Sequence, residues 1–339
     1  MTMQPLLLVL GALMMAACSD VQTSNLAQEA RATAASSEHL QDGRIRDTFR
    51  FDEFETQAAV DVLIIDDNSD SMRDKQEKLA ARLASFLGSL GKIDWQIGIT
   101  TTDTSNGTYG LQGSLVEFAG TGSKILTKKT ENYAQAFADT VIRRETISCN
   151  YDCPSNDERP LRATIQAIQK RDSENAGFFR DGADLAVIIL SDEDEASVGG
   201  PDANRPTDVL EAFRTAFGDS KSLNGFGILI APDDKKCYES ESMFGANYAK
   251  VLSQFVMLTG GVVGSLCAND YGPTLAGIGQ RVREGVKTAI LTALPVAESV
   301  QVHVTPADPT LTWTMDGRRL TFAHPPKPGA TVIVEYQVE

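Results

Sequence analysis

The sequence of 339 residues has no excess of basic side chains and very few histidines. Its 31 Lys and Arg residues are outnumbered by 46 Asp and Glu residues, which gives a net charge of −15. Proteins that bind nucleic acid need a basic surface to neutralise phosphates, so this balance argues against nucleic acid as a partner. The three histidines, His39, His303 and His324, lie far from the cysteines, which argues against a zinc site.

The sequence also lacks the short motifs that mark common enzymes. It contains no glycine-rich phosphate-binding loop, no nucleophile elbow of the G-x-S-x-G type and no histidine placed for a catalytic triad. We therefore expect a protein that is not an enzyme.

No apolar run is long enough to span a bilayer, but one near the start is typical of export. Residues 6–17 form an apolar stretch of about twelve residues that ends in Met15-Ala16-Ala17-Cys18. Small residues before a cleavage point indicate a signal peptide over residues 1–17. The cysteine that follows resembles the lipobox of bacterial lipoproteins, in which this cysteine is acylated and becomes the new N-terminus.

This lipobox resemblance implies a lipid on Cys18 and anchoring without a transmembrane helix. Ser19 after the cysteine favours the outer membrane of a Gram-negative bacterium. Two features depart from the pattern: Met15 stands where Leu is usual, and residues 1–5 carry no Lys or Arg. The alternatives are an ordinary secretory peptide cleaved nearby or a start codon assigned at the wrong position. Residues 18–46 are polar and rich in Ala, Ser and Gln, which predicts a flexible tether.

The cysteines after Cys18 form an even set, as expected for an exported protein with disulfides. They are Cys149, Cys153, Cys237 and Cys267, and four cysteines allow three pairings. We favour Cys149 with Cys153, a short local loop, and Cys237 with Cys267, which closes about thirty residues.

Strand and helix patterns alternate between residues 47 and 294. Runs that are apolar at all but one position, such as Val60–Ile65 and Asp184–Leu190, are typical of parallel strands that are buried on both faces. The alternation predicts an α/β domain with a doubly wound, largely parallel sheet and helices on both faces. We expect residues 47–54 to form a short leading strand of this domain.

The pattern changes after residue 294. Four short strand signals follow, and Asp316-Gly317 between two of them indicates a hairpin. Residues 295–339 are therefore expected to form a small C-terminal all-β unit, with Trp313 and Phe322 in its core.

Two of the predicted strands end in clusters of short oxygen-bearing side chains. The run Val60–Ile65 ends in Asp66-Asp67-Asn68-Ser69-Asp70-Ser71, and Asp184–Leu190 ends in Ser191-Asp192-Glu193-Asp194. Because ligands bind beyond the carboxyl ends of parallel strands, both clusters belong at one edge of the sheet. Such oxygen-rich loops are suited to a hard cation.

The segment VDVLIIDDNSDSM resembles the metal-ion-dependent adhesion site of von Willebrand factor A domains, whose usual form is VDVxFVxDxSGSM. Asp67-x-Ser69-x-Ser71 matches the motif, and Asp70 stands where Gly is common. The resemblance implies that Asp67, Ser69, Ser71 and Asp192 hold the metal, with Ser191 where Thr is frequent. The family's second metal-binding loop usually offers a Thr just before a helix. No Thr is present here, so we choose Ser155, with Asp157 as the alternative.

Two serine hydroxyls are neutral ligands, so a bound cation keeps charge with which to take an acidic group from a partner. Mg²⁺ suits such a site, and Mn²⁺ or Ca²⁺ is an alternative. The competing interpretation is that Asp67 and Ser69 only cap the following helix. Asp192 would then belong to a helix start or a solvated loop. We expect Glu193, Asp194 and Glu195 to be solvated or to support the site from outside it.

We therefore predict a lipid-anchored envelope protein whose von Willebrand factor A-like domain captures a carboxylate of a protein or cell-surface ligand, in adhesion or envelope assembly. The first alternative is a structural envelope lipoprotein in which the cation only stabilises the fold. The second is an accessory subunit of a hydrolase or chelatase.

Overall fold

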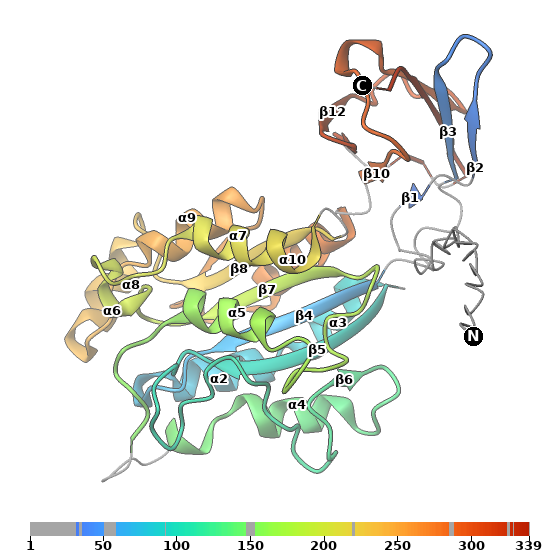
Figure 1. Cartoon of the computed structure of the whole chain (residues 1–339). Helices are drawn as coiled ribbons and strands as arrows, with labels where there is room; N and C mark the ends of the chain where they lie inside the picture. The colour runs from blue at the N-terminus through green and yellow to red at the C-terminus, as the bar shows by residue number, and fades with distance from the viewer. Residues whose placement is uncertain are drawn as a thin grey trace, which may run out of the picture.

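The computed structural model describes residues 32–33, 36–50, 59–91, 93–146, 153–218, 221–284, 288–323, 326–327 and 329–338. Within these ranges the chain forms a large α/β domain and a smaller β domain (Figure 1). The predicted signal peptide, the lipidation site Cys18 and Cys149 lie outside the described residues. In the described part of the chain, no helix has the length and apolar character needed to cross a membrane.

The α/β domain is built on a six-stranded sheet in the order β6-β5-β4-β7-β8-β9. Its strands are β4 (Ala59–Asp66), β5 (Asp94–Thr101), β6 (Leu126–Thr127), β7 (Asp184–Leu190), β8 (Leu223–Leu229) and β9 (Val263–Ser265). All neighbours pair in parallel except β5 and β6, which are antiparallel. This order reverses between β4 and β7, so the predicted doubly wound, largely parallel sheet is confirmed.

Helices cover both faces of this sheet (Figure 1). They are α2 (Arg73–Ala80), α3 (Leu83–Leu90), α4 (Tyr133–Val141), α5 (Pro160–Gln169), α6 (Ala196–Gly199), α7 (Pro206–Phe217), α8 (Lys235–Glu241), α9 (Lys250–Leu258) and α10 (Gly272–Glu284). Short 3-10 turns are η1 (Asp70–Met72), η2 (Arg144–Thr146) and η3 (Ser242–Phe244).

The apolar run of β4 explains how the two layers are held. Val62 and Ile64 point to a core shared with α2, α3, α4 and α10, whereas Leu63 and Ile65 point to a core shared with α5, α7 and α9. Successive strand residues face opposite sides, so a strand buried on both faces is mostly apolar. The buried exception in β4 is Asp61, which forms ion pairs with Arg180 and Lys221. The central strands are therefore fixed, and the loops at their carboxyl ends are held in place.

The β domain contains two four-stranded sheets that share one core. The first has the order β1-β10-β13-β12 and the second β11-β14-β3-β2. The strands are β1 (Ala32–Thr33), β2 (Ser36–His39), β3 (Ile45–Arg50), β10 (Thr288–Ile290), β11 (Gln301–Thr305), β12 (Trp313–Asp316), β13 (Arg319–Phe322) and β14 (Thr331–Tyr336). Phe322 is fully buried in this core, and Trp313 packs against it while partly exposed. The turn η5 (Ala297–Ser299) precedes β11.

This arrangement corrects the predicted domain limits. The strand expected at the start of the α/β domain is β3, which pairs with β14 of the β domain instead. Residues 36–39 were expected to be tether, but they form β2 beside β3. The all-β unit is therefore not purely C-terminal, because segments from both sides of the α/β domain build it.

The local pattern of β3 gives the reason for the error. Ile45, Asp47 and Phe49 are buried and alternate with more exposed residues. This alternation is typical of a sheet with one covered face, not of the doubly covered strands of the α/β domain. The sequence specified the strand, but its partner lies about 290 residues away, and no local signal encodes such a pairing.

The β domain contacts the amino ends of the central strands. Arg319 of β13 donates hydrogen bonds to Ser222 Oγ (2.6 Å) and to the carbonyl oxygen of Lys221 (3.1 Å), just before β8 begins. Figure 1 shows the β domain at this end, with α6 and α8 at the far end. Because the β domain contacts the amino ends of the strands, the carboxyl edge of the sheet lies away from it.

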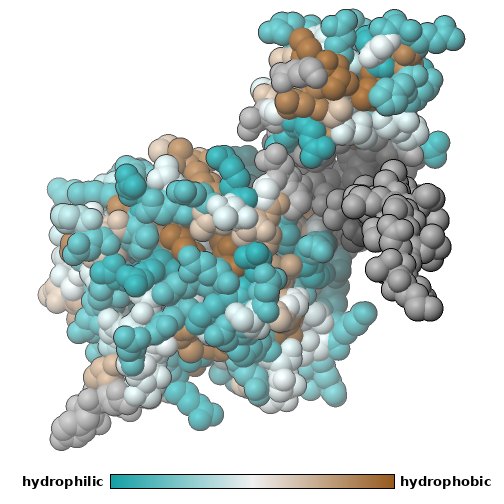
Figure 2. Space-filling model, in the orientation of Figure 1, coloured by the Kyte–Doolittle hydropathy of each residue, from teal (hydrophilic) through white to brown (hydrophobic). Residues whose placement is uncertain are grey.

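The surfaces of the two domains differ in hydropathy. In Figure 2 the visible face of the α/β domain is largely hydrophilic, whereas apolar side chains gather on the β domain.

Candidate metal-binding site

The loop after β4 brings the predicted motif residues together. Asp67 is fully buried, and its Oδ1 accepts a hydrogen bond from the backbone N–H of Ser69 at 2.9 Å. The hydroxyls of Ser69 and Ser71 lie 3.1 Å apart. Ser69 stands at the N-terminus of η1, yet its side chain makes no capping hydrogen bond. Ser69 therefore does not cap the helix through its side chain, and its hydroxyl is directed instead to Ser71 and Asp67.

The loop after β7 meets the first loop, as expected for two neighbouring parallel strands. Ser191 Oγ donates to Asp67 Oδ2 at 2.7 Å. Asp192 is 2% exposed, and the hydroxyl of Ser71 hydrogen-bonds its carboxylate. Nevertheless Asp192 Oδ1 is buried without a hydrogen-bond partner among the described residues. A buried carboxylate oxygen without a partner is costly, and a bound cation would satisfy it.

The next acids of the loop after β7 (the third loop), Asp194 and Glu195, are not solvated, so of the two predicted alternatives they follow the one in which they support the site from outside it. Asp194 is fully buried and accepts hydrogen bonds from the backbone N–H groups of residues 250–252, so it caps the start of α9. Glu195 is also fully buried and accepts from Leu161 and Arg162 in the first turn of α5. Helix N-termini carry unpaired N–H donors and a positive partial charge, which explains why two buried acids are stable here.

In the second loop, which precedes α5 and contains Ser155, Asp157 and Glu158, Ser155 bonds within its own surroundings and not to the motif. The backbone N–H of Ser155 donates to Asp103 Oδ2 (2.9 Å), and its hydroxyl accepts from the N–H of Asp157 (3.1 Å). No described hydrogen bond joins either Ser155 or Asp157 to the motif loop or to Asp192. The acid of this loop that acts on the site is Glu158, which is 1% exposed.

Glu158 is held from two sides. Its backbone forms an isolated antiparallel β-bridge with Asp103, just after β5. On its side chain, Oε2 accepts a hydrogen bond from Ser197 Oγ at 2.8 Å. Ala196 and Ser197 have φ values of 53° and 59°, a left-handed conformation that is unusual outside glycine. The prediction missed Glu158, although it lies just before the Pro160 start of α5, where the resemblance stated above would place a Thr.

Burial and mutual repulsion raise the pKa values of these acids. Burial and the negative charge of Glu158 raise the pKa of Asp67 to about 7. Burial and the charge of Asp67 raise the pKa of Asp192 to about 7. Burial and a hydrogen bond with Glu193 raise the pKa of Glu158 to about 9. These acids thus lie close enough to influence one another, and each keeps its proton to a higher pH than an isolated carboxyl group does.

The donor set is chemically suited to a hard cation. It offers carboxylate and hydroxyl oxygens and no sulfur or imidazole ligand. Within the described residues, no group of three or more His, Cys, Asp and Glu side chains is arranged to hold a metal ion. A cation at this edge would therefore depend on the serine hydroxyls and water together with Asp67 and Asp192, as Mg²⁺ commonly does.

The cysteines support the loops around this edge. Cys237 of α8 forms a disulfide with Cys267, the pairing predicted from the sequence. Cys153 is also disulfide-bonded, but Cys149 lies outside the described residues, so its pairing with Cys153 stays a prediction.

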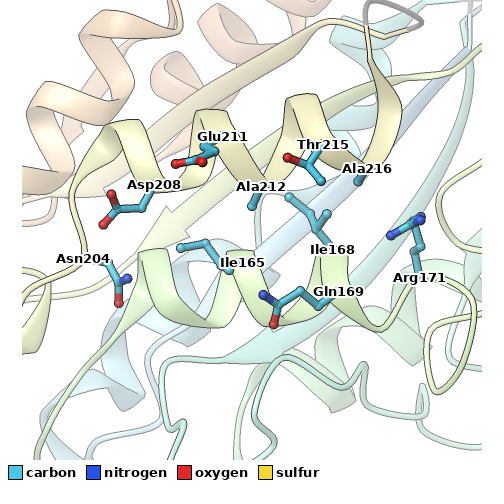
Figure 3. A pocket seen from close by; sticks show the side chains of 10 residues that line it. All are labelled: Ile165, Ile168, Gln169, Arg171, Asn204, Asp208, Glu211, Ala212, Thr215 and Ala216. Atoms are coloured by element: carbon cyan, nitrogen blue, oxygen red, sulfur yellow. The ribbon is translucent and has the colours of Figure 1, made fainter.

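A separate groove lies between α5 and α7 (Figure 3). It has a volume of about 470 Å³, and its lining includes Ile165 and Ile168 of α5 and Ala212 and Thr215 of α7. None of the residues that line it belongs to the three loops described above. The groove is therefore separate from the candidate metal site.

Strand order and site together define a class: a doubly wound α/β domain with a candidate cation site where the strand order reverses. No protein-family model and no curated protein matches the sequence. Similar solved structures include a von Willebrand factor type A protein from Catenulispora acidiphila, with 15% identity and a TM-score of 0.42 over 87% of this chain and 61% of that chain.

Two further solved structures show a similar degree of likeness. The pilus adhesin SpaC from Lactobacillus rhamnosus GG has 10% identity and a TM-score of 0.39, covering 86% of this chain and 41% of its own. BatB from Bacteroides thetaiotaomicron has 14% identity and a TM-score of 0.36, covering 66% of this chain and 97% of its own. This chain thus spans about two fifths of SpaC. Because all three TM-scores are below 0.5, the assignment of the fold rests on the strand order of this chain and not on these similarities.

Proposed function

We propose that this chain is a lipid-anchored envelope protein whose α/β domain uses a divalent cation to bind an acidic group of a protein or cell-surface ligand. The observation that carries the proposal is the unpartnered Oδ1 of the buried Asp192, beside Asp67 and the hydroxyls of Ser69 and Ser71. When bound, a cation such as Mg²⁺ would supply an open coordination position for a carboxylate oxygen.

The residues of the chain have distinct roles in this proposal. Ser69 and Ser71 offer neutral oxygens, so they leave most of the cation's charge for a partner. Asp67 is held by Ser191 and by the backbone of Ser69, and contributes negative charge from a fixed position. Asp192 supplies a carboxylate from the loop after β7. Because all four are positioned by the ends of β4 and β7, little rearrangement is needed for binding.

The domain arrangement fits a surface role. The chain enters the α/β domain from β3 and returns to the β domain after α10. A lipid on Cys18 would therefore attach the β domain's side of the molecule to the membrane, and the site lies at the opposite edge of the sheet. This orientation supports a partner that approaches from outside the anchored end.

A second candidate function is structural: the cation would only stabilise the fold of an envelope lipoprotein. It is favoured by Glu158, a buried acid beside Asp67 that adds negative charge and so reduces the attraction of a bound cation for a further carboxylate. Both candidates require the same metal residues, so only a binding measurement separates them.

A pull-down from envelope extracts, with and without EDTA, tests the first function. We expect a partner that is retained with Mg²⁺, released by EDTA and recovered when Mg²⁺ is restored. Asp67→Ala should lose it, whereas Asp70→Ala, a change at an exposed acid of the same loop, should retain it.

Two outcomes contradict the binding function. One is a partner whose retention ignores EDTA. The other is a chain whose thermal stability falls in Asp67→Ala while no cation-dependent partner is found, which supports the structural function instead.

A further inference from the structure

Three exposed apolar side chains belong to segments that contact the candidate site. Seven large apolar side chains are exposed among the described residues. Phe244 (66% exposed) and Met243 (79%) lie in η3, and Val198 (63%) lies in α6. Exposed aromatic and Met side chains are enriched at protein interfaces, so their gathering near a candidate binding site is informative.

Hydrogen bonds fix the η3 segment beside the motif loop. Glu241, at the end of α8, accepts from Lys75 Nζ at 2.9 Å, and the same ammonium group donates to the carbonyl oxygen of Ser71 at 3.1 Å. Lys75 is buried, so this link is shielded from solvent. Met243 and Phe244 therefore lie two and three residues after Glu241, which is hydrogen-bonded to Lys75 beside the motif.

The other end of η3 is fixed to the third loop. The backbone N–H of Asn247 donates to the carbonyl oxygen of Asp192 at 2.9 Å. Gly245 lies against Glu193, since a Cβ added to it would be 3.8 Å from Glu193 Oε1. The two apolar residues thus project from a short segment held at both ends by the candidate site.

Val198 lies in α6, which follows the loop after β7 and contacts Glu158 of the second loop. It follows Ser197, whose hydroxyl binds Glu158, and it precedes Gly199, whose N–H donates to the carbonyl oxygen of Glu195 at 2.8 Å. Its side chain is exposed although its neighbours are bound to the site's acids. Apolar groups therefore flank an oxygen-rich centre on the sides of both η3 and α6.

We propose that Met243, Phe244 and Val198 form an apolar rim that receives bulky apolar side chains next to the acidic residue of a protein ligand. The proposal rests on the proposed cation-dependent function. A cation at the centre matches a carboxylate by charge, and the rim offers no cationic side chain to hold further acids. The occupant is therefore a protein segment in which Asp or Glu is flanked by an aromatic or large aliphatic residue.

Selection of random peptides displayed on phage tests this preference. The full chain is immobilised with Mg²⁺, and bound peptides are released with EDTA and sequenced. We expect an Asp or Glu adjacent to an aromatic or large aliphatic residue. For the selected peptide, the double change Met243→Ser with Phe244→Ser should raise Kd by about 10- to 100-fold, from the loss of two apolar contacts.

Met257→Ser is the matched control, because Met257 is 71% exposed but lies near the far end of α9. We expect its Kd to change less than about twofold, as for a surface substitution outside the contact. Unchanged thermal unfolding of both variants establishes that the fold is intact.

The outcomes separate this inference from the function on which it rests. Peptides that EDTA releases, but that show no apolar preference or bind the double variant equally well, overturn the apolar rim and leave the cation-dependent function standing. If EDTA releases no peptides, the cation-dependent function itself is contradicted, and the rim is rejected with it.

Discussion

Removing the charge of Asp67 should stabilise the protein when no metal is bound, although it destroys the proposed metal site. Without a cation, Asp67 is a fully buried acid whose pKa is raised to about 7, first by burial and then by the charge of Glu158. Asp67→Asn removes this charge, its oxygen can still accept from the N–H of Ser69, and its amide NH₂ can donate to Ser191 Oγ, because a hydroxyl can accept as well as donate. The structural cost of the substitution should therefore be small.

The direction of the pH effect follows from proton binding. In the unfolded chain this carboxyl ionises near its ordinary pKa of about 3.9. In the folded chain it keeps its proton up to about pH 7. The folded state binds more protons in this window, so the free energy of unfolding falls as pH rises from about 4 to about 7 and changes little from this group above that.

The magnitude follows from the same displacement. Moving a carboxyl pKa from about 3.9 to about 7 corresponds to roughly 4 kcal/mol in favour of the protonated form. Asp192 and Glu158 repel the same charge, so the acids titrate together and the full value does not belong to Asp67 alone. We expect Asp67→Asn to stabilise the metal-free protein by roughly 1–3 kcal/mol at pH 8 and by about a third of that near pH 5.

Urea unfolding in EDTA at both pH values measures this difference, and repeating it with Mg²⁺ measures the metal. The native chain should gain about 2.7 kcal/mol when Mg²⁺ is at a hundred times its Kd, whereas the variant should gain almost none. Asp70→Asn is the control, since Asp70 is exposed in the same loop. Equal destabilisation of Asp67→Asn at both pH values would refute the reasoning, as would equal stabilisation of both proteins by Mg²⁺.

Three further outcomes are expected. Glu158→Thr should weaken Mg²⁺ binding roughly tenfold in calorimetry, because a buried negative charge beside Asp67 is lost; an unchanged Kd would mean that Glu158 does not act on the cation. Asp194→Ala should cost roughly 2–4 kcal/mol in urea unfolding, because the N–H groups at the start of α9 lose their acceptor; a loss below about 0.5 kcal/mol would contradict this capping role. Cys18→Ser should abolish labelling by a palmitate analogue, and labelling that persists would exclude this cysteine as the lipid site.

The α/β fold was predictable because its central strands carry a strong signal. A strand covered on both faces is mostly apolar, and the runs Val62–Ile65 and Leu185–Leu190 are wholly so. The connection rules for parallel strands then place their carboxyl ends at one edge. For this reason the proximity of Asp67 and Asp192 could be expected from sequence, even though about 120 residues separate them.

The β domain and the second loop were less predictable, for a physical reason that they share. The alternation of Ile45, Asp47 and Phe49 specifies one buried face, but it does not specify that the neighbouring strand is β14. Likewise, the sequence around Ser155 and Glu158 identifies a polar loop before α5 without showing which side chain turns inward. That choice depends on Ser197, which lies 39 residues further along the chain.

The acids of the third loop show how the site can be rigid before any cation binds. Asp194 fixes the start of α9, and Glu195 fixes the first turn of α5. Because both helices also pack on β4 and β7 through Leu63 and Leu185, the loop between these caps has little freedom to move. Asp192 lies in the same loop after β7 and is therefore held against Asp67 despite their repulsion. The free energy needed to bring these negative charges together is supplied by folding. A cation that binds therefore gains their attraction without having to reorganise the loop.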